Sequence, residues 1–113
     1  NKMIGTCDFW HVDFKNSCGE IGYVINKDYW NKGIVTKALK ELIKFGFEYL
    51  ELERIQIAHA TDNPASQRVI EKCDFRIEGL TRHSEKRKTG EFVDHKIYSI
   101  LKNEYTKKEL SWQ

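Results

Sequence analysis

The chain has 113 residues, of which 40% are hydrophobic and 12% aromatic, with a single proline. This length and balance are those of one packed globular domain, and they exclude a disordered, fibrous or multidomain chain. Lysine and arginine outnumber aspartate and glutamate by 19 to 17, and the resulting net charge of +2 is too small to indicate a nucleic-acid or membrane partner by itself.

Two strands and a long helix are predicted in the first half of the chain. Apolar and polar residues mix from Lys2 to Phe14, and the turn-forming stretch Lys15–Gly19 separates them from the strand-like run Glu20–Ile25. This pattern predicts an antiparallel hairpin. From Ile34 to Leu50, apolar residues recur at steps of three and four, with lysines and glutamates on the other side. That spacing predicts an amphipathic helix.

A strand and a short helix are predicted next. Arg54–Ala60 sets two isoleucines on one face of a strand. Asn63 is then followed by Pro64, and an asparagine before a proline is typical of a capped helix start with proline at the first helical position. We therefore expect a helix from Pro64 to Lys72.

The last third of the chain predicts a second hairpin. Phe75–Leu80 and Glu91–Leu101 are both β-like, and the polar stretch Arg82–Gly90 joins them. The predicted order is thus β, β, α, β, α, β, β. This order indicates an α/β fold with one mixed, mainly antiparallel sheet and helices packed on it, in a single domain over residues 1–113. Lys102–Gln113 is expected to be a solvated tail.

The cysteine content and the hydropathy of the chain indicate the cellular compartment in which the protein is expected. The three cysteines have no CxxC spacing and are odd in number, so we expect neither a disulfide framework nor a metal site. A reducing cytoplasm is the expected location. No apolar run approaches ~20 residues, and no signal-like segment opens the chain, so we expect neither membrane insertion nor export.

A glycine-containing segment precedes the long predicted helix. It reads Tyr29–Thr36 and lies between a strand and the helix start. The first turn of a helix offers unpaired N–H groups and the positive end of the helix dipole, and Gly33 allows a ligand close to the backbone. Thr36 adds a hydroxyl and Lys32 a charge, which suits a pyrophosphate. An isolated glycine at a helix start is more often only structural.

A second polar cluster follows the strand that ends at Ala60. Asp62-Asn63-Pro64-Ala65-Ser66 opens the second helix at the carboxyl end of a strand, where α/β sheets bind ligands. Asn63 and Ser66 are candidate site residues for this reason. The alternative is a purely structural role, in which Asn63 caps the helix and Ser66 supports its first turn.

Four motifs occur in an order and spacing that resemble one known family. In chain order they are Ile21-Gly22-Tyr23-Val24-Ile25, then Tyr29-Trp30-Asn31-Lys32-Gly33-Ile34, then Asn63-Pro64-Ala65-Ser66-Gln67-Arg68-Val69-Ile70-Glu71-Lys72, then Phe75, Glu78-Gly79-Leu80 and Arg82. Together they resemble the GNAT superfamily of N-acyltransferases, most closely the branch that acetylates ribosomal-protein N-termini and related acceptors. The resemblance runs from about Met3 to Leu101.

The resemblance implies acetyl-coenzyme A as co-substrate, no metal, and a primary amine as acceptor, either a protein N-terminus or a small-molecule amine. It also implies a V-shaped split in the sheet that receives the pantetheine arm. By resemblance, the residues that bind the coenzyme are Val24, Ile25, Trp30, Asn31, Lys32, Gly33, Ile34, Val35, Thr36, Asn63 and Ser66.

The catalytic roles are also carried by the resemblance. A backbone N–H near Ile25 is the implied oxyanion donor. Many relatives have a tyrosine in the helix after Asn63 to assist the leaving group, and this chain has none there, so Ser66 is the expected substitute. The base, by contrast, does not follow from the resemblance: Glu20, Glu85, Asp94 and His95 are all possible, and each is by default an ordinary surface or strand residue. We name Glu20, together with Asn63 and Ser66, as the catalytic candidates. Asp94 and His95 occupy opposite faces of a strand, so at most one is expected to reach the cleft.

This sequence also departs from the family pattern. Val35 stands where the family usually has glycine or alanine, and Asp74 stands where it usually has glycine. The family's first strand and two acceptor-site helices have no counterpart before Met3, so an N-terminally truncated fold is expected. A non-catalytic coenzyme-binding or structural remnant is therefore the alternative function. An exposed edge strand over Met3–Phe14 predicts a homodimer, and a nucleic-acid-binding module is disfavoured because basic and acidic residues are interleaved.

Overall fold

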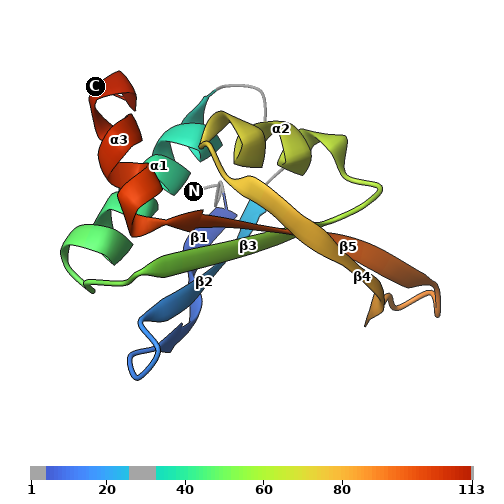
Figure 1. Ribbon diagram of the computed structural model, residues 1–113. Helices are drawn as coiled ribbons and strands as arrows, with labels where there is room; N and C mark the ends of the chain where they lie inside the picture. The colour runs from blue at the N-terminus through green and yellow to red at the C-terminus, as the bar shows by residue number, and fades with distance from the viewer. Residues whose placement is uncertain (1–4, 26–32, 113) are drawn as a thin grey trace.

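The structure, a computed structural model, describes residues 5–25 and 33–112, which form one five-stranded sheet and three helices (Figure 1). The strand order is β1-β2-β3-β5-β4, and every neighbouring pair is antiparallel except β2 and β3. The fold is therefore α/β with a mixed, mainly antiparallel sheet. The elements are β1 (Gly5–Asp13), β2 (Cys18–Ile25), α1 (Ile34–Glu48), β3 (Arg54–Ala60), α2 (Pro64–Lys72), β4 (Arg76–Lys86), β5 (Phe92–Leu101) and α3 (Lys102–Trp112).

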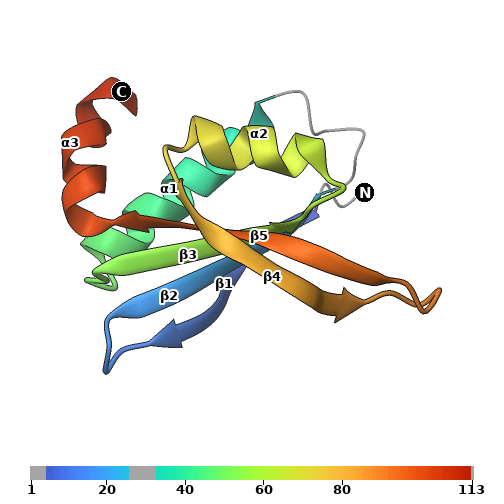
Figure 2. The ribbon, with the colours of Figure 1, turned by 45° about the vertical axis from the view of Figure 1, so that its right-hand side comes forward.

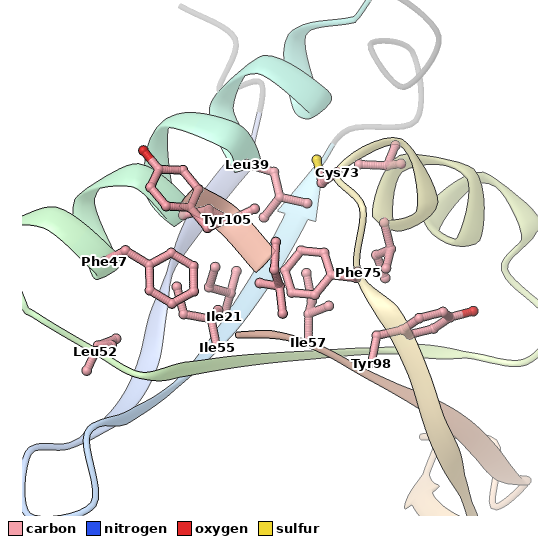
Figure 3. Close-up of a cluster of buried hydrophobic side chains, with 14 of the residues drawn as sticks. Ile21, Leu39, Phe47, Leu52, Ile55, Ile57, Cys73, Phe75, Tyr98 and Tyr105 are labelled. Atoms are coloured by element: carbon pink, nitrogen blue, oxygen red, sulfur yellow. The ribbon is translucent and has the colours of Figure 1, made fainter. Parts of the chain in front are cut away.

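All three helices lie on the same side of the sheet (Figures 1 and 2). The core forms between them and the sheet. On α1, Val35, Leu39, Ile43 and Phe47 recur every four residues and are buried, because residues four apart lie on one helix face. Burial alternates along β3, so that its isoleucines contact this face from below (Figure 3). The predicted amphipathic helix and alternating strand are confirmed.

The central parallel pair of strands separates toward its carboxyl end. β2 and β3 are paired from Cys18↔Arg54 to Ile21↔Ile57, and no further pairs follow between them. Beyond that point, β2 stays paired with β1 as far as Ile25, and β3 stays paired with β5 as far as Ala60. The sheet therefore has the V-shaped split that the family resemblance implies.

The C-terminal segment is a helix, so the expectation of a solvated tail was wrong. The helix α3 is anchored by Tyr105, which is 4% exposed and stacks on Phe47 with ring centroids 5.1 Å apart (Figure 3). The Tyr105 hydroxyl donates to Glu48 Oε2 at 2.5 Å. Glu104 Oε1 accepts from the Leu101 N–H at 2.9 Å and so satisfies a donor where the helix begins. Tyr105 is buried in a mostly polar segment, and a single such position gives no periodic signal, which is why the pattern missed this helix.

The strand β4 is also longer than predicted. It continues to Lys86, through residues that were assigned to a polar connection. Pairing with β5 shifts between Thr81 and Glu85, and His83 in that interval has a positive φ of 49°. Every residue of β4 is exposed. The alternation that marks a half-buried strand is therefore absent, and only the pairing with β5 defines this part of the strand.

Candidate functional site

A cavity of about 460 Å³ lies at the split between β2 and β3. Its volume is within the range of ordinary ligand pockets. Successive residues of a strand face opposite sides of a sheet, so the cavity is lined from both sides of the sheet. Its lining residues are Trp10, Glu20, Gly22, Tyr23, Ala58, His59, Ala60, Asn63, Ser66, Ser84, Glu85 and His95.

Asn63 and Ser66 line this cavity from the start of α2. The Asn63 side-chain oxygen Oδ1 accepts from the Ser66 N–H at 3.2 Å, which is the geometry of an N-cap. Asn63 is half-buried and Ser66 is 6% exposed. The capping role and the position at the cavity therefore coexist, because the same turn that caps α2 brings both residues to the end of β3.

A tyrosine that the sequence analysis did not select lies against Ser66. The Tyr23 hydroxyl donates to Ser66 Oγ at 2.8 Å, across the split from β2 to α2. Burial raises the pKa of Tyr23 to about 12, while the hydrogen bond to Ser66 acts in the opposite direction. The two residues are 43 positions apart in the sequence, and only the alternation that puts Tyr23 on the same face as the buried Ile21 could have indicated this contact.

Three of the four base candidates line the cavity, namely Glu20, Glu85 and His95. Asp94 does not. Its carboxylate accepts from the His83 N–H at 2.7 Å, and Asp94 lines a separate cavity of about 270 Å³ at the β4–β5 hairpin. The expectation that at most one of Asp94 and His95 reaches the cleft is confirmed.

The three cavity-lining candidates differ in their partners. His95 is held on both ring nitrogens, with Ser84 Oγ 2.9 Å from Nδ1 and Glu85 Oε1 3.0 Å from Nε2. Glu20 is half-buried, and its carboxylate has no hydrogen bond or ion pair to any residue in 5–25 or 33–112. Glu20 is therefore the carboxylate that remains available at the cavity.

A buried histidine forms part of the cavity wall. His59 is 5% exposed, with Nδ1 2.7 Å from the Ala60 carbonyl oxygen and Nε2 3.1 Å from the Tyr98 hydroxyl. Only a donor can bond a carbonyl oxygen, so Nδ1 carries the proton and Nε2 accepts from Tyr98. Both nitrogens are satisfied within the protein, and His59 holds the end of β3 in place.

The start of α1 has the features of an anion site. Gly33 is in the left-handed region with φ of 73° and ψ of −6°, and a Cβ there would meet nothing within 4 Å. Among residues 5–25 and 33–112 no side chain caps this helix, and its first turn contains no acidic residue. The first N–H groups of α1 therefore have no side-chain acceptor in the part of the chain that the structure describes.

The other predicted coenzyme contacts are placed as follows. Val35 is 2% exposed and buried beside Tyr23 and Ser66, so a ligand can reach it only through its backbone. Ile34 and Val24 are exposed, and Thr36 is half-buried. Ile25 ends β2, and the predicted contacts at Trp30, Asn31 and Lys32 lie outside the described residues.

The described residues show neither a cluster of metal ligands nor a membrane-spanning helix. Within residues 5–25 and 33–112, no three His, Cys, Asp or Glu side chains gather as metal ligands would. None of the helices that the structure describes is long and apolar enough to cross a membrane.

Comparison with known proteins identifies the family. Residues 1–76 match the family model described as the acetyltransferase (GNAT) domain. The uncharacterized N-acetyltransferase p20 of Bacillus licheniformis is 38% identical over 105 residues, which cover 93% of this chain and 58% of that protein. The ribosomal-protein-serine acetyltransferase of Escherichia coli K12 is 32% identical over 85 residues, covering 75% of this chain and 48% of that protein.

Solved structures agree with the sequence relatives. The crystal structure of a GNAT-family acetyltransferase from Bacillus anthracis superposes with a TM-score of 0.77 at 34% identity, covering 88% of this chain and 59% of that one. The chain thus spans between 48% and 59% of the length of these relatives. The matched domain, the split sheet and these relatives together show that the chain belongs to the GNAT acetyltransferase family.

Proposed function

We propose that this protein is an N-acetyltransferase that moves the acetyl group of acetyl-coenzyme A to a primary amine. The observation that carries the proposal is the cavity at the split between β2 and β3, because it joins the start of α2, with Asn63 and Ser66, to a free carboxylate at Glu20. Membership of the family supports the chemistry.

The coenzyme would bind along β2 and at the start of α1. Beyond Ile21 the side of β2 that faces β3 has no strand partner. The backbone groups near Val24 and Ile25 are therefore available to pair with the amide groups of the pantetheine arm, in the way that an added strand pairs with a sheet edge. The uncapped first turn of α1, with Gly33, would accept the pyrophosphate.

The reaction requires a neutral amine, an oxyanion site and help for the departing thiolate. Glu20 accepts a proton from the ammonium form of the acceptor, directly or through water. The amine then attacks the thioester carbonyl, and a backbone N–H near Ile25 donates to the oxygen that becomes negative. As the carbon–sulfur bond breaks, the nitrogen loses its second proton to water, and the sulfur keeps the electron pair and accepts a hydrogen bond from Ser66.

The choice of Glu20 over His95 follows from their contacts. His95 is bonded on both nitrogens by Ser84 and Glu85, so it would have to break a contact before taking a proton. The Glu20 carboxylate has no such partner among the described residues. Carboxylates at this cavity also favour a cationic acceptor such as an ammonium group. A protein N-terminus and a small-molecule amine both satisfy that requirement, and the E. coli relative is named for a ribosomal-protein acceptor.

Steady-state assays with acetyl-coenzyme A and a panel of amines test this function. Release of free thiol should depend on an amine, and Glu20→Gln should lower kcat/KM by about 10²-fold or more, with the loss smallest at high pH where more of the amine is already neutral. Glu41→Gln is a matched control, because Glu41 is exposed on α1 and lines neither cavity. Binding of the coenzyme without turnover of any amine would support the non-catalytic alternative instead.

A further inference from the structure

The hydrogen bond between Tyr23 and Ser66 points to a role for a residue of the first motif to which the sequence analysis gave no function. We propose that Tyr23 is a positioning residue that turns the Ser66 hydroxyl proton toward the sulfur of the leaving thiolate. This inference rests on the proposed acetyl transfer, and it deepens the account of its final step.

The direction of the hydrogen bond is the first argument. A serine hydroxyl has one proton and two lone pairs. The Tyr23 phenol, which is the more acidic of the two hydroxyls, donates to Ser66 Oγ at 2.8 Å. The Ser66 proton then has to point elsewhere, and no acceptor for it lies among residues 5–25 and 33–112. A donor directed into the cavity is what a developing thiolate requires.

Burial and position are the second argument. Ser66 is 6% exposed, and both Tyr23 and Ser66 line the cavity at the split. A hydrogen bond is stronger in such a site than in water, and a donor that is itself polarised by a second donor is stronger still. Burial also keeps the phenol protonated, because the pKa of Tyr23 is raised to about 12. Tyr23 therefore remains a donor over the whole range of pH in which an amine acetyltransferase is assayed.

The breaking of the carbon–sulfur bond balances in atoms and electrons without any proton transfer from Tyr23. The carbon–sulfur bond breaks, the electron pair stays on sulfur, and the thiolate accepts the hydrogen bond of Ser66, whose oxygen still accepts from Tyr23. Two protons leave the nitrogen: the ammonium proton passes through Glu20 to bulk water, and the one lost from nitrogen after the attack balances the proton that the thiolate gains from water on release. Tyr23 holds Ser66 in one rotamer throughout, without touching the substrate.

A double-mutant cycle tests the inference. Tyr23→Phe keeps the ring and removes only the hydroxyl, and it should lower kcat about 10-fold with KM for acetyl-coenzyme A unchanged. Ser66→Ala should lower kcat more, and the double variant should be no slower than Ser66→Ala alone, since Tyr23 acts only through Ser66. Tyr98→Phe is the matched control because its hydroxyl is also bonded to one buried side chain, His59, and it should leave kcat within twofold.

The opposite results would overturn it. If Tyr23→Phe kept the full kcat, or lowered kcat equally in the presence and absence of the Ser66 hydroxyl, Tyr23 would not act through Ser66, while the acetyltransferase assignment would stand. If the unmodified protein acetylated no amine, both proposals would fail together.

A second measurement covers the case in which Tyr23→Phe folds poorly. A ring-fluorinated tyrosine at position 23 keeps the size of the side chain and lowers the pKa of the phenol into the assay range. Above that pKa the phenolate accepts the Ser66 proton instead of donating, so kcat should fall as pH rises through it. A pH profile identical to that of the natural protein would overturn the proposal.

Discussion

Arg87 and Asp62 are joined by two parallel hydrogen bonds, Nη1 to Oδ2 at 2.8 Å and Nη2 to Oδ1 at 2.9 Å. This pair ties the β4–β5 hairpin to the residue just before Asn63. The hairpin carries Glu85 and His95, and the loop leads into Ser66, so one ion pair connects two walls of the cavity. A bidentate contact of this kind fixes geometry as well as distance.

We expect Arg87→Ala to lower kcat/KM several-fold, because small displacements of Asn63 and Ser66 from the thioester are costly to catalysis. Arg87→Lys should restore only part of the loss, since a lysine cannot form both bonds. Steady-state kinetics at two salt concentrations check this. Full activity of the alanine variant would show that the loop holds its position without Arg87.

The same ion pair predicts how the stability of the fold depends on pH. The Arg87 guanidinium lowers the pKa of Asp62 below its usual value. A carboxyl whose pKa is depressed by folding contributes stability at neutral pH, and the contribution is lost as pH falls through the folded-state pKa. The midpoint of unfolding should therefore drop with acid less steeply in Asp62→Asn than in the natural protein. Equal slopes in thermal melts from pH 6 to pH 3 would contradict this.

Gly33 offers a direct test of the anion site. Gly33→Glu places a negative charge at the helix start and should weaken acetyl-coenzyme A binding by about 10-fold or more, because the same end of the dipole should attract the pyrophosphate. Gly33→Ala is the matched control, since it has a similar conformational cost at φ of 73° without the charge. Isothermal titration calorimetry measures both. Equal affinities of the two variants would place the pyrophosphate elsewhere.

The elements that the sequence predicted well are those with a strong local signal. The helix α2 has its predicted bounds, Pro64–Lys72, because an asparagine cap and a proline mark its start. The strand β3 also has its predicted bounds, because its isoleucines alternate regularly. Asp74 adopts a positive φ of 64°, the left-handed cap in which the family usually has glycine.

What the sequence did not reveal depends on contacts between distant residues. The helix α3 is held in place by the stacking of Tyr105 on Phe47, and these two residues are 58 positions apart in the sequence. The pairing of Tyr23 with Ser66 spans 43 positions. Asn63 and Ser66 could be named in advance from their place after a strand and from the family resemblance, but periodicity alone could not show that they share one cavity with Glu20.

The docking of α3 gives a prediction for stability. Tyr105→Ala should lower the free energy of unfolding by about 3 kcal/mol, because it removes a buried aromatic ring from the core. Tyr49→Ala is a control of the same chemistry at a position that is 78% exposed, and its effect should be within about 0.5 kcal/mol. Urea denaturation of both variants gives the comparison. Equal stabilities would mean that α3 contributes little to the core.

The exposed side of β1 predicts self-association. Among the described residues only β2 pairs with β1, and Trp10 on β1 and Phe14 just after it are each 67% exposed. The Asp8 carboxylate accepts from the Phe9 N–H at 2.8 Å, so part of the backbone edge is already satisfied. We therefore expect the exposed aromatic rings to supply most of the contact in a homodimer.

Light scattering at micromolar concentration should report about twice the chain mass of 13.4 kDa. Phe14→Lys should shift the protein toward the monomer, because a charged side chain would have to be desolvated in the contact. Tyr49→Lys changes another exposed aromatic at the end of α1, outside β1, and should leave the mass unchanged. A natural protein with the mass of a monomer would refute the dimer. If the two variants had the same mass in solution, the contact between subunits would have to lie elsewhere than at β1.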